Sequence, residues 1–137
     1  TLNQCISGDN VFLRLNITSF MSLNNINVVV IVMDNQEVVL TTLHTRFKDF
    51  SIDHISAGSH ELSVNVPCLN LAEGRYFVSL RLMYGSSSGA AGATLADHID
   101  GAFYFDIIGG DFFGTGRKTN PQKHGNLLLE HNWSYGK

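Results

Sequence analysis

Three pairs of polar residues, each pair two positions apart in an alternating stretch, carry side chains suited to sugar recognition. Arginine, asparagine and aspartate supply hydrogen-bond donors and acceptors for sugar hydroxyls, and an aromatic ring can cover the C–H face of a sugar. Strand alternation places both members of each pair on the outward face of a sheet. The candidate ligand-binding residues are Arg14, Asn16, Ser79, Arg81, Tyr104 and Asp106. The same pattern also fits an ordinary solvated sheet face, so ligand binding at these positions is a hypothesis.

A glycine-rich stretch at residues 110–119 invites a nucleotide-binding interpretation. A phosphate-binding loop needs Gly, Lys and Ser or Thr in direct succession at the start of a helix, whose amides hold the phosphates. Here Arg117 separates Gly116 from Lys118, and Asn120-Pro121 is expected to block a helix. The glycines therefore indicate a sharp turn between two late strands.

Other residues that could support catalysis or metal binding lack the required spacing. The six histidines have no i, i+2 or i+4 pairs, although a site built across strands stays open; they are His44, His54, His60, His98, His124 and His131. Asp97 and Asp100 resemble a glycosidase acid–base pair, but we expect them to cap a turn. No Ser/His/Asp or Cys/His signature is present. We predict no catalytic residues, no metal and no cofactor.

Short strands must position the candidate residues. Residues 26–33 are β-branched and almost continuously apolar, which is typical of a central strand covered on both sides. Residues 34–37 indicate a hairpin turn, and residues 46–59 a loop with one short helical turn. The other predicted strands are residues 11–18, 38–45, 60–66, 75–84, 102–108 and 126–131. Seven or eight short strands without an amphipathic helix predict an all-β, immunoglobulin-like antiparallel β-sandwich.

Two loop and turn segments complete the pattern. Residues 85–92 are rich in Gly, Ser and Ala, which predicts a mobile loop. Residues 71–78 resemble the tyrosine-corner segment of immunoglobulin-like domains, which predicts that the Tyr76 hydroxyl bonds back to the turn and has a structural role.

The composition limits the possible partners. The chain has 137 residues, a formal net charge of −3 and only 15% charged residues, while 44% are hydrophobic. Nucleic-acid binding needs an excess of Lys and Arg, which this chain lacks. The longest apolar run, residues 28–33, is far shorter than the roughly 20 residues of a membrane span, and the first ten residues do not form a signal peptide. We expect one domain, residues 1–137, that is a fragment of a longer protein because it lacks an initiator Met.

The two cysteines bear on the compartment. Cys5 and Cys68 are separated like an immunoglobulin disulfide, but the single Trp133 lies outside the pair instead of between them. We predict two free thiols in a reducing compartment.

The order of motifs resembles the C-terminal carbohydrate-binding domain of Wzt, the nucleotide-binding subunit of ABC transporters that export O-antigen polysaccharide. The resemblance covers nearly the whole chain. It rests on residues 32–42, 71–80, 97–107 and 111–116, followed by His124-Gly125 and the terminal Trp133. The family has no linear motif for its sugar site, so the resemblance transfers no binding residue to this sequence.

The resemblance implies a non-catalytic sandwich that binds the modified non-reducing end of a finished O-antigen glycan and so licenses its export. It implies a homodimer with exchanged C-terminal strands. It also implies a cytoplasmic position at the bacterial inner membrane, where an ATPase domain absent from this chain contacts the membrane subunit. Two different functions stay open: a dimerisation module that binds no glycan, and a secreted adhesin-type sandwich with a Cys5–Cys68 disulfide. An enzyme is a more distant third.

Overall fold

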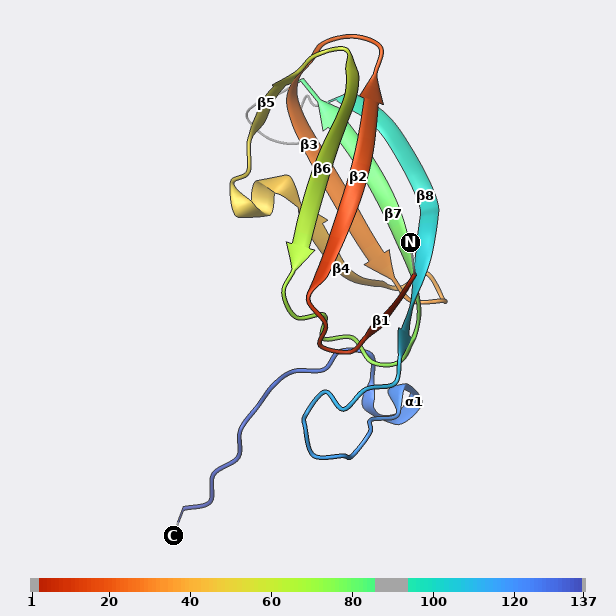
Figure 1. Ribbon diagram of the computed structural model, residues 1–137, viewed down its shortest axis with the longest axis vertical. Coiled ribbons are helices and arrows are strands. Elements are labelled where there is room, and N and C mark those ends of the chain that lie inside the picture. The colour runs from red at the N-terminus through yellow and green to blue at the C-terminus, as the bar shows by residue number, and fades with distance from the viewer. Residues whose placement is uncertain (1–2, 86–93, 137) are drawn as a thin grey trace. The chain divides into compact units, whose positions relative to one another are not determined.

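The computed structural model describes residues 3–85 and 94–136, apart from the side chains of residues 94–101. Most of its regular structure is β-strand (Figure 1). The strands are β1 (Gln4–Ile6), β2 (Val11–Ser19), β3 (Leu23–Met33), β4 (Val39–His44), β5 (Ile52–Ile55), β6 (Gly58–Val66), β7 (Gly74–Tyr84) and β8 (Thr94–Ile108). A 3-10 turn, η1 (Thr45–Lys48), follows β4, and a one-turn helix, α1 (Pro121–His124), follows β8.

The strands form two sheets. The larger has the order β1-β8-β7-β3-β4, with β5 paired to the other end of β3, and the smaller consists of β2 and β6. β3 pairs antiparallel with β4, β5 and β7, whereas the short β1 runs parallel to β8. This arrangement confirms the predicted all-β, immunoglobulin-like sandwich.

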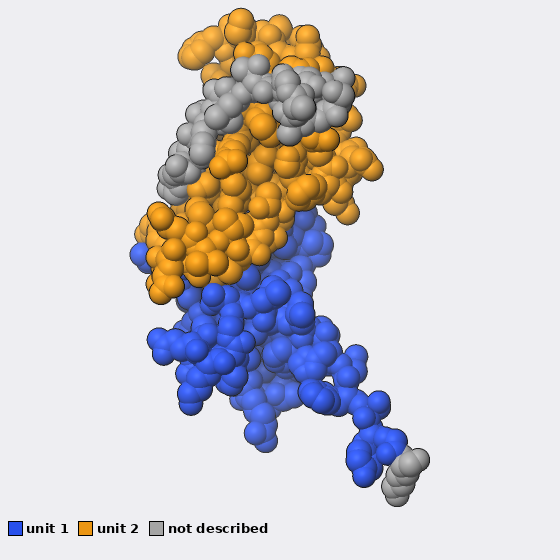
Figure 2. Space-filling view, turned by 180° about the vertical axis from the view of Figure 1, so that it is seen from behind, with its two compact units in different colours: residues 1–12, 65–75, 105–137 blue, residues 13–64, 76–104 orange. Residues whose placement is uncertain are grey.

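The chain divides into two compact units (Figure 2). The first unit comprises residues 1–12, 65–75 and 105–137, and the second comprises residues 13–64 and 76–104. In the first unit Leu71, Ala72, Ile107 and Leu128 are buried. The hydroxyl of the buried Ser7 donates a 2.7 Å hydrogen bond to the carbonyl of Leu71, which joins the N-terminal segment to this core.

The second unit has its core on β3, as the apolar run predicts. Ile26, Val28, Val30 and Val32 are all buried, and strand alternation turns these four side chains to one face of the sheet. β3 is a central strand, hydrogen-bonded to β7 along one edge and to β4 or β5 along the other. The predicted alternation of β2 is confirmed: Leu15 is buried, while Phe12, Arg14, Asn16 and Thr18 are exposed.

Tyr76 and Val78 of β7 are also buried, as the inward face of that strand predicts. Burial, with a smaller contribution from the charge of Asp34, raises the pKa of Tyr76 to about 12. Asp34 itself shapes the predicted hairpin turn between β3 and β4. Its Oδ1 accepts hydrogen bonds from the backbone N–H groups of Gln36 at 2.8 Å and Val38 at 3.0 Å.

Several boundaries differ from the sequence-based expectation. Residues 126–131 are not a strand: only Leu127 forms a bridge, to Leu71. Two backbone hydrogen bonds flank this bridge, from Ala72 N–H to the carbonyl of Asn126 at 2.8 Å and from Leu128 N–H to the carbonyl of Asn70 at 2.7 Å. Asn120-Pro121 begins α1 instead of blocking a helix. Asn120 caps it by accepting from Gln122 N–H, and proline at the first helical position removes no intrahelical hydrogen bond.

The remaining differences concern the strands and loops. β1 and β5 are two short strands that the sequence pattern did not predict. β8 begins at Thr94, so the backbone of Asp97 and Asp100 is strand and not the expected turn, while their side chains lie outside the described residues. Residues 86–92 of the predicted mobile loop also lie outside them. Cys5 and Cys68 are free thiols.

Candidate functional site

The six predicted site residues do not form one cluster. Arg14, Asn16, Ser79, Arg81 and Tyr104 belong to the second unit, and Asp106 belongs to the first.

Asp106 is already engaged in an ion pair. Arg75 donates two hydrogen bonds to its carboxylate, from Nε at 2.7 Å and from a terminal nitrogen at 2.9 Å. These bonds to the charged form hold the pKa of Asp106 below its usual value. A sugar hydroxyl would have to compete with a bidentate guanidinium for the same oxygens.

Ser79 is not on the accessible surface, and the prediction of a solvated side chain is wrong at this position. Its exposed fraction is 2%. β7 is a central strand, and Ser79 pairs with Ile31 of β3. Ile31 lies beside it, and Phe77 and Arg81 lie two residues away on the same face. These longer side chains shield the short hydroxyl of Ser79.

Arg14, Asn16 and Arg81 are brought to one place. They line a cavity of about 330 Å³ between β2 and the β7–β8 part of the larger sheet, which we call the β2–β7 cleft. Leu80, Leu82 and Phe103 also line it, and strand alternation turns Leu80 and Leu82 to the opposite face of β7 from Arg81. Tyr104 does not line this cleft. It is exposed, and its ring lies 6.3 Å from that of Phe77.

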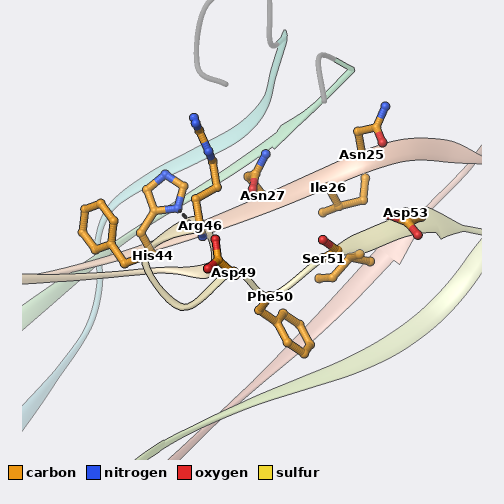
Figure 3. A pocket seen from close by; sticks show the side chains of 11 residues that line it. Asn25, Ile26, Asn27, His44, Arg46, Asp49, Phe50, Ser51 and Asp53 are labelled. Carbon is orange, nitrogen blue, oxygen red and sulfur yellow. Dashed lines mark hydrogen bonds between the residues drawn. The ribbon is translucent and has the colours of Figure 1, made fainter. Parts of the chain in front are cut away.

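A second, larger hollow lies where η1 meets β3 and β5 (Figure 3). Its volume is about 540 Å³, within the usual range of roughly 300–1,000 Å³ for ligand pockets. We call it the η1 hollow. The polar residues that line it are Asn25, Asn27, His44, Arg46, Asp49, Ser51 and Asp53.

Local hydrogen bonds fix the shape of η1. The His44 side chain caps the turn by accepting from Arg46 N–H at 3.1 Å. Asp49 ends it in the left-handed region, with its own N–H bonded to the carbonyl of Arg46. The hydroxyl of Thr45 accepts from Val28 N–H and donates to Asn27 Oδ1, both at 3.2 Å. These bonds tie the turn to β3 and so position the hollow.

The polar groups of the η1 hollow have spare hydrogen-bonding capacity. Within the described residues, the side chains of Arg46, Asp49 and Asp53 make no hydrogen bond or ion pair, and the NH₂ group of Asn27 donates none. Figure 3 shows the side chains of Asn27 and Arg46 extending in the same direction from β3 and η1. A guanidinium, two carboxylates and an amide therefore border one hollow.

Aromatic rings complete the lining. Phe47 is 70% exposed, and its ring lies 5.2 Å from that of His44. Burial, and then the positive charge of Arg46, lower the pKa of His44, which favours the neutral imidazole. Phe50 also borders the hollow and is exposed.

The η1 hollow was not predicted from the sequence. Residues 46–59 indicated only an irregular loop, and the apolar run that identified β3 made no use of Asn25 and Asn27. Two phenylalanines close together, Phe47 and Phe50, were the available signal, because large apolar residues at the surface of a loop suggest a binding surface.

The described residues hold no group of three or more His, Cys, Asp or Glu side chains arranged to bind a metal ion. None of the helices in that part of the chain is long and apolar enough to cross a membrane.

A family model of the Wzt C-terminal domain matches residues 1–123. The chain belongs to the Wzt C-terminal domain family. Among solved structures, a protein described as the crystal structure of the C-terminal domain of Wzt is similar, with a TM-score of 0.75 and 10% sequence identity. The alignment covers 96% of this chain and 73% of that one. No curated protein matches the chain significantly.

Membership in the Wzt C-terminal domain family fits the resemblance found in the sequence. It associates the chain with the carbohydrate-binding domains of O-antigen ABC transporters. At 10% identity, the solved Wzt domain supports the sandwich fold and transfers no individual residue.

Proposed function

We propose that this Wzt C-terminal domain binds the modified non-reducing terminus of an O-antigen polysaccharide without cleaving it, and couples completion of the glycan to export by the ABC transporter. The match to the family over residues 1–123 is the observation that carries the proposal. In support, the second unit has two cavities bordered by amides, charged groups and aromatic rings, the side chains that bind hydroxylated ligands.

The proposed binding site is the β2–β7 cleft, which three of the residues selected from the sequence line. Arg14 and Arg81 would pair with an anionic cap, and Asn16 would bind sugar hydroxyls. Tyr104 would cover a sugar face beside Phe77. Ser79 and Asp106 have weaker support, because Ser79 is buried and Asp106 is paired with Arg75.

The domain would work as a homodimer within a larger assembly. Residues 1–137 would form one carbohydrate-binding domain of a transporter subunit whose ATPase domain contacts the membrane subunit at the cytoplasmic face of the inner membrane. The C-terminal segment supports exchange between partners. Trp133 is 89% exposed and Tyr135 is 92% exposed, and Leu127 and Leu129 are exposed as well. Such apolar residues are normally covered in an assembly.

Affinity electrophoresis in gels containing O-antigen polysaccharide from the producing strain tests the proposal, together with light scattering for the molar mass. Retarded migration and a dimeric mass are expected. A dimer with unretarded migration would instead support a dimerisation module that binds no glycan. Two further readouts test for a secreted adhesin and for an enzyme. A thiol count below two in non-reducing conditions would indicate the adhesin-type disulfide, and a shortened polysaccharide after incubation would indicate an enzyme.

A further inference from the structure

The η1 hollow lies beside the sheet face that carries Arg81, so the two surfaces can contact one ligand. Val29 of β3 pairs with Arg81 of β7 on one side and with His44 of β4 on the other. Directly opposed residues point to the same face, and neighbouring strands are about 4.8 Å apart. Arg81 and His44 are therefore about two strand spacings apart on one face, and His44 borders the hollow.

The charges around the η1 hollow disfavour an anion. Asp49 and Asp53 contribute two negative charges and Arg46 one positive charge, while the His44 imidazole is largely neutral at neutral pH. An anionic group in the hollow would gain one guanidinium and face two carboxylates. A neutral sugar avoids this repulsion, because its hydroxyls can donate to the carboxylates and accept from the guanidinium and the Asn27 amide.

We infer that the η1 hollow binds an uncharged pyranose unit of the glycan. Hydroxyls would donate to Asp49 and Asp53 and accept from Arg46 and Asn27, and an apolar sugar face would contact the exposed ring of Phe47. The inference rests on the proposed function and specifies its ligand. A charged cap, in a glycan that has one, would contact Arg81 or Arg14 outside the hollow.

Nuclear magnetic resonance titration tests the ligand class. The ¹⁵N-labelled domain is titrated separately with the methyl glycosides of mannose, galactose and glucose, with methyl glucuronoside and with methyl glucosaminide. We expect at least one neutral glycoside to shift the backbone amides of Asn27, Ser51 and Asp53, and the glucuronoside to shift them less at equal concentration. Stronger shifts with the glucuronoside or the amino sugar would overturn the assignment to an uncharged unit, as would no shift with any neutral glycoside.

Substitutions test the location with the full polysaccharide. Phe47→Ala is expected to weaken retention about two- to tenfold and Asp53→Asn about tenfold. Two controls match these changes at exposed positions outside the hollow: Phe20→Ala, where the ring is 98% exposed, and Glu61→Gln on β6. The inference would be overturned if each variant were retained as strongly as its control: Phe47→Ala as Phe20→Ala, and Asp53→Asn as Glu61→Gln. Retention of the wild type in the same gels would still uphold the proposed function. Failure of the wild type to bind the polysaccharide, with neutral glycosides still shifting the hollow amides, would refute the proposed function alone.

Discussion

Replacing Thr45 with valine should loosen the 3-10 turn that positions the η1 hollow. The last β3–β4 pair toward this end is Val29 with His44, so Val28 has no strand partner on that side. The Thr45 hydroxyl takes the place of the missing carbonyl and accepts from Val28 N–H at 3.2 Å. Valine has nearly the same shape as threonine but cannot accept this hydrogen bond.

The magnitude follows from the group that loses its partner. A buried donor left without an acceptor costs about 1–3 kcal/mol, and Val28 is buried. Asn27 Oδ1, the other partner of Thr45, is only half-buried and can bind water, so its loss adds little. We expect Thr45→Val to lower the free energy of unfolding by about 1–3 kcal/mol. For a chain of this size that corresponds to roughly 3–12 °C in Tm.

Urea denaturation followed by circular dichroism measures the effect, with Thr45→Ser as the matched control. Serine keeps the hydroxyl and loses one methyl group, so its cost should stay below about 1 kcal/mol. Thr45→Val should also weaken polysaccharide retention relative to Thr45→Ser, because the turn carries Arg46. Equal stability of the two variants would show that the Thr45 hydroxyl does not hold the turn to β3.

Three further outcomes follow from the structure. Arg75→Met should return the pKa of Asp106 toward its usual value near 3.8 in a carboxyl NMR titration. The variant should also lose the stability that the wild type has above this pH and loses as the pH falls below it. Identical titrations of the two proteins would contradict the ion pair. The phenol of Tyr76 should ionise near pH 12. The stability linked to its neutral form should therefore persist below pH 10 and be lost as the pH rises through 12. An ultraviolet difference spectrum between the wild type and Tyr76→Phe with a transition near pH 10 would contradict this. If the cap is anionic, Arg81→Ala or Arg14→Ala should weaken capped-glycan binding about tenfold or more without unfolding the domain; unchanged affinity in both would exclude the cleft.

Strand alternation predicted the parts of the fold that are set by burial. Residues such as Leu15 and Val78 point inward because one face of each strand is covered, and the sequence records this directly. The parts set by pairing were harder to predict. β1 and β5 are three and four residues long, too short for a period to show. Residues 126–131 have strand composition, but their pairing is a single bridge from Leu127 to Leu71.

In the candidate site, too, only the features that follow from strand alternation could be predicted from the sequence. Outward positions such as Arg14 and Arg81 could be selected from alternation, and the fold brings them to one cleft. Alternation could not reveal that longer neighbours cover Ser79, or that Asp106 is held by Arg75. The η1 hollow depends on a capped turn folding back against β3, and no periodic pattern in the sequence records that contact.

Isothermal titration calorimetry with capped and uncapped O-antigen glycan from the producing strain tests recognition of the chain end most directly. The two ligands should have the same repeating units and length and differ only at the non-reducing terminus. We predict binding of the capped glycan at least about tenfold tighter than that of the uncapped one, the ratio expected for one charge-assisted hydrogen bond or its equivalent. Equal affinity for both would show that the domain binds the repeating units and not the modified end, and would contradict the proposed coupling of chain completion to export.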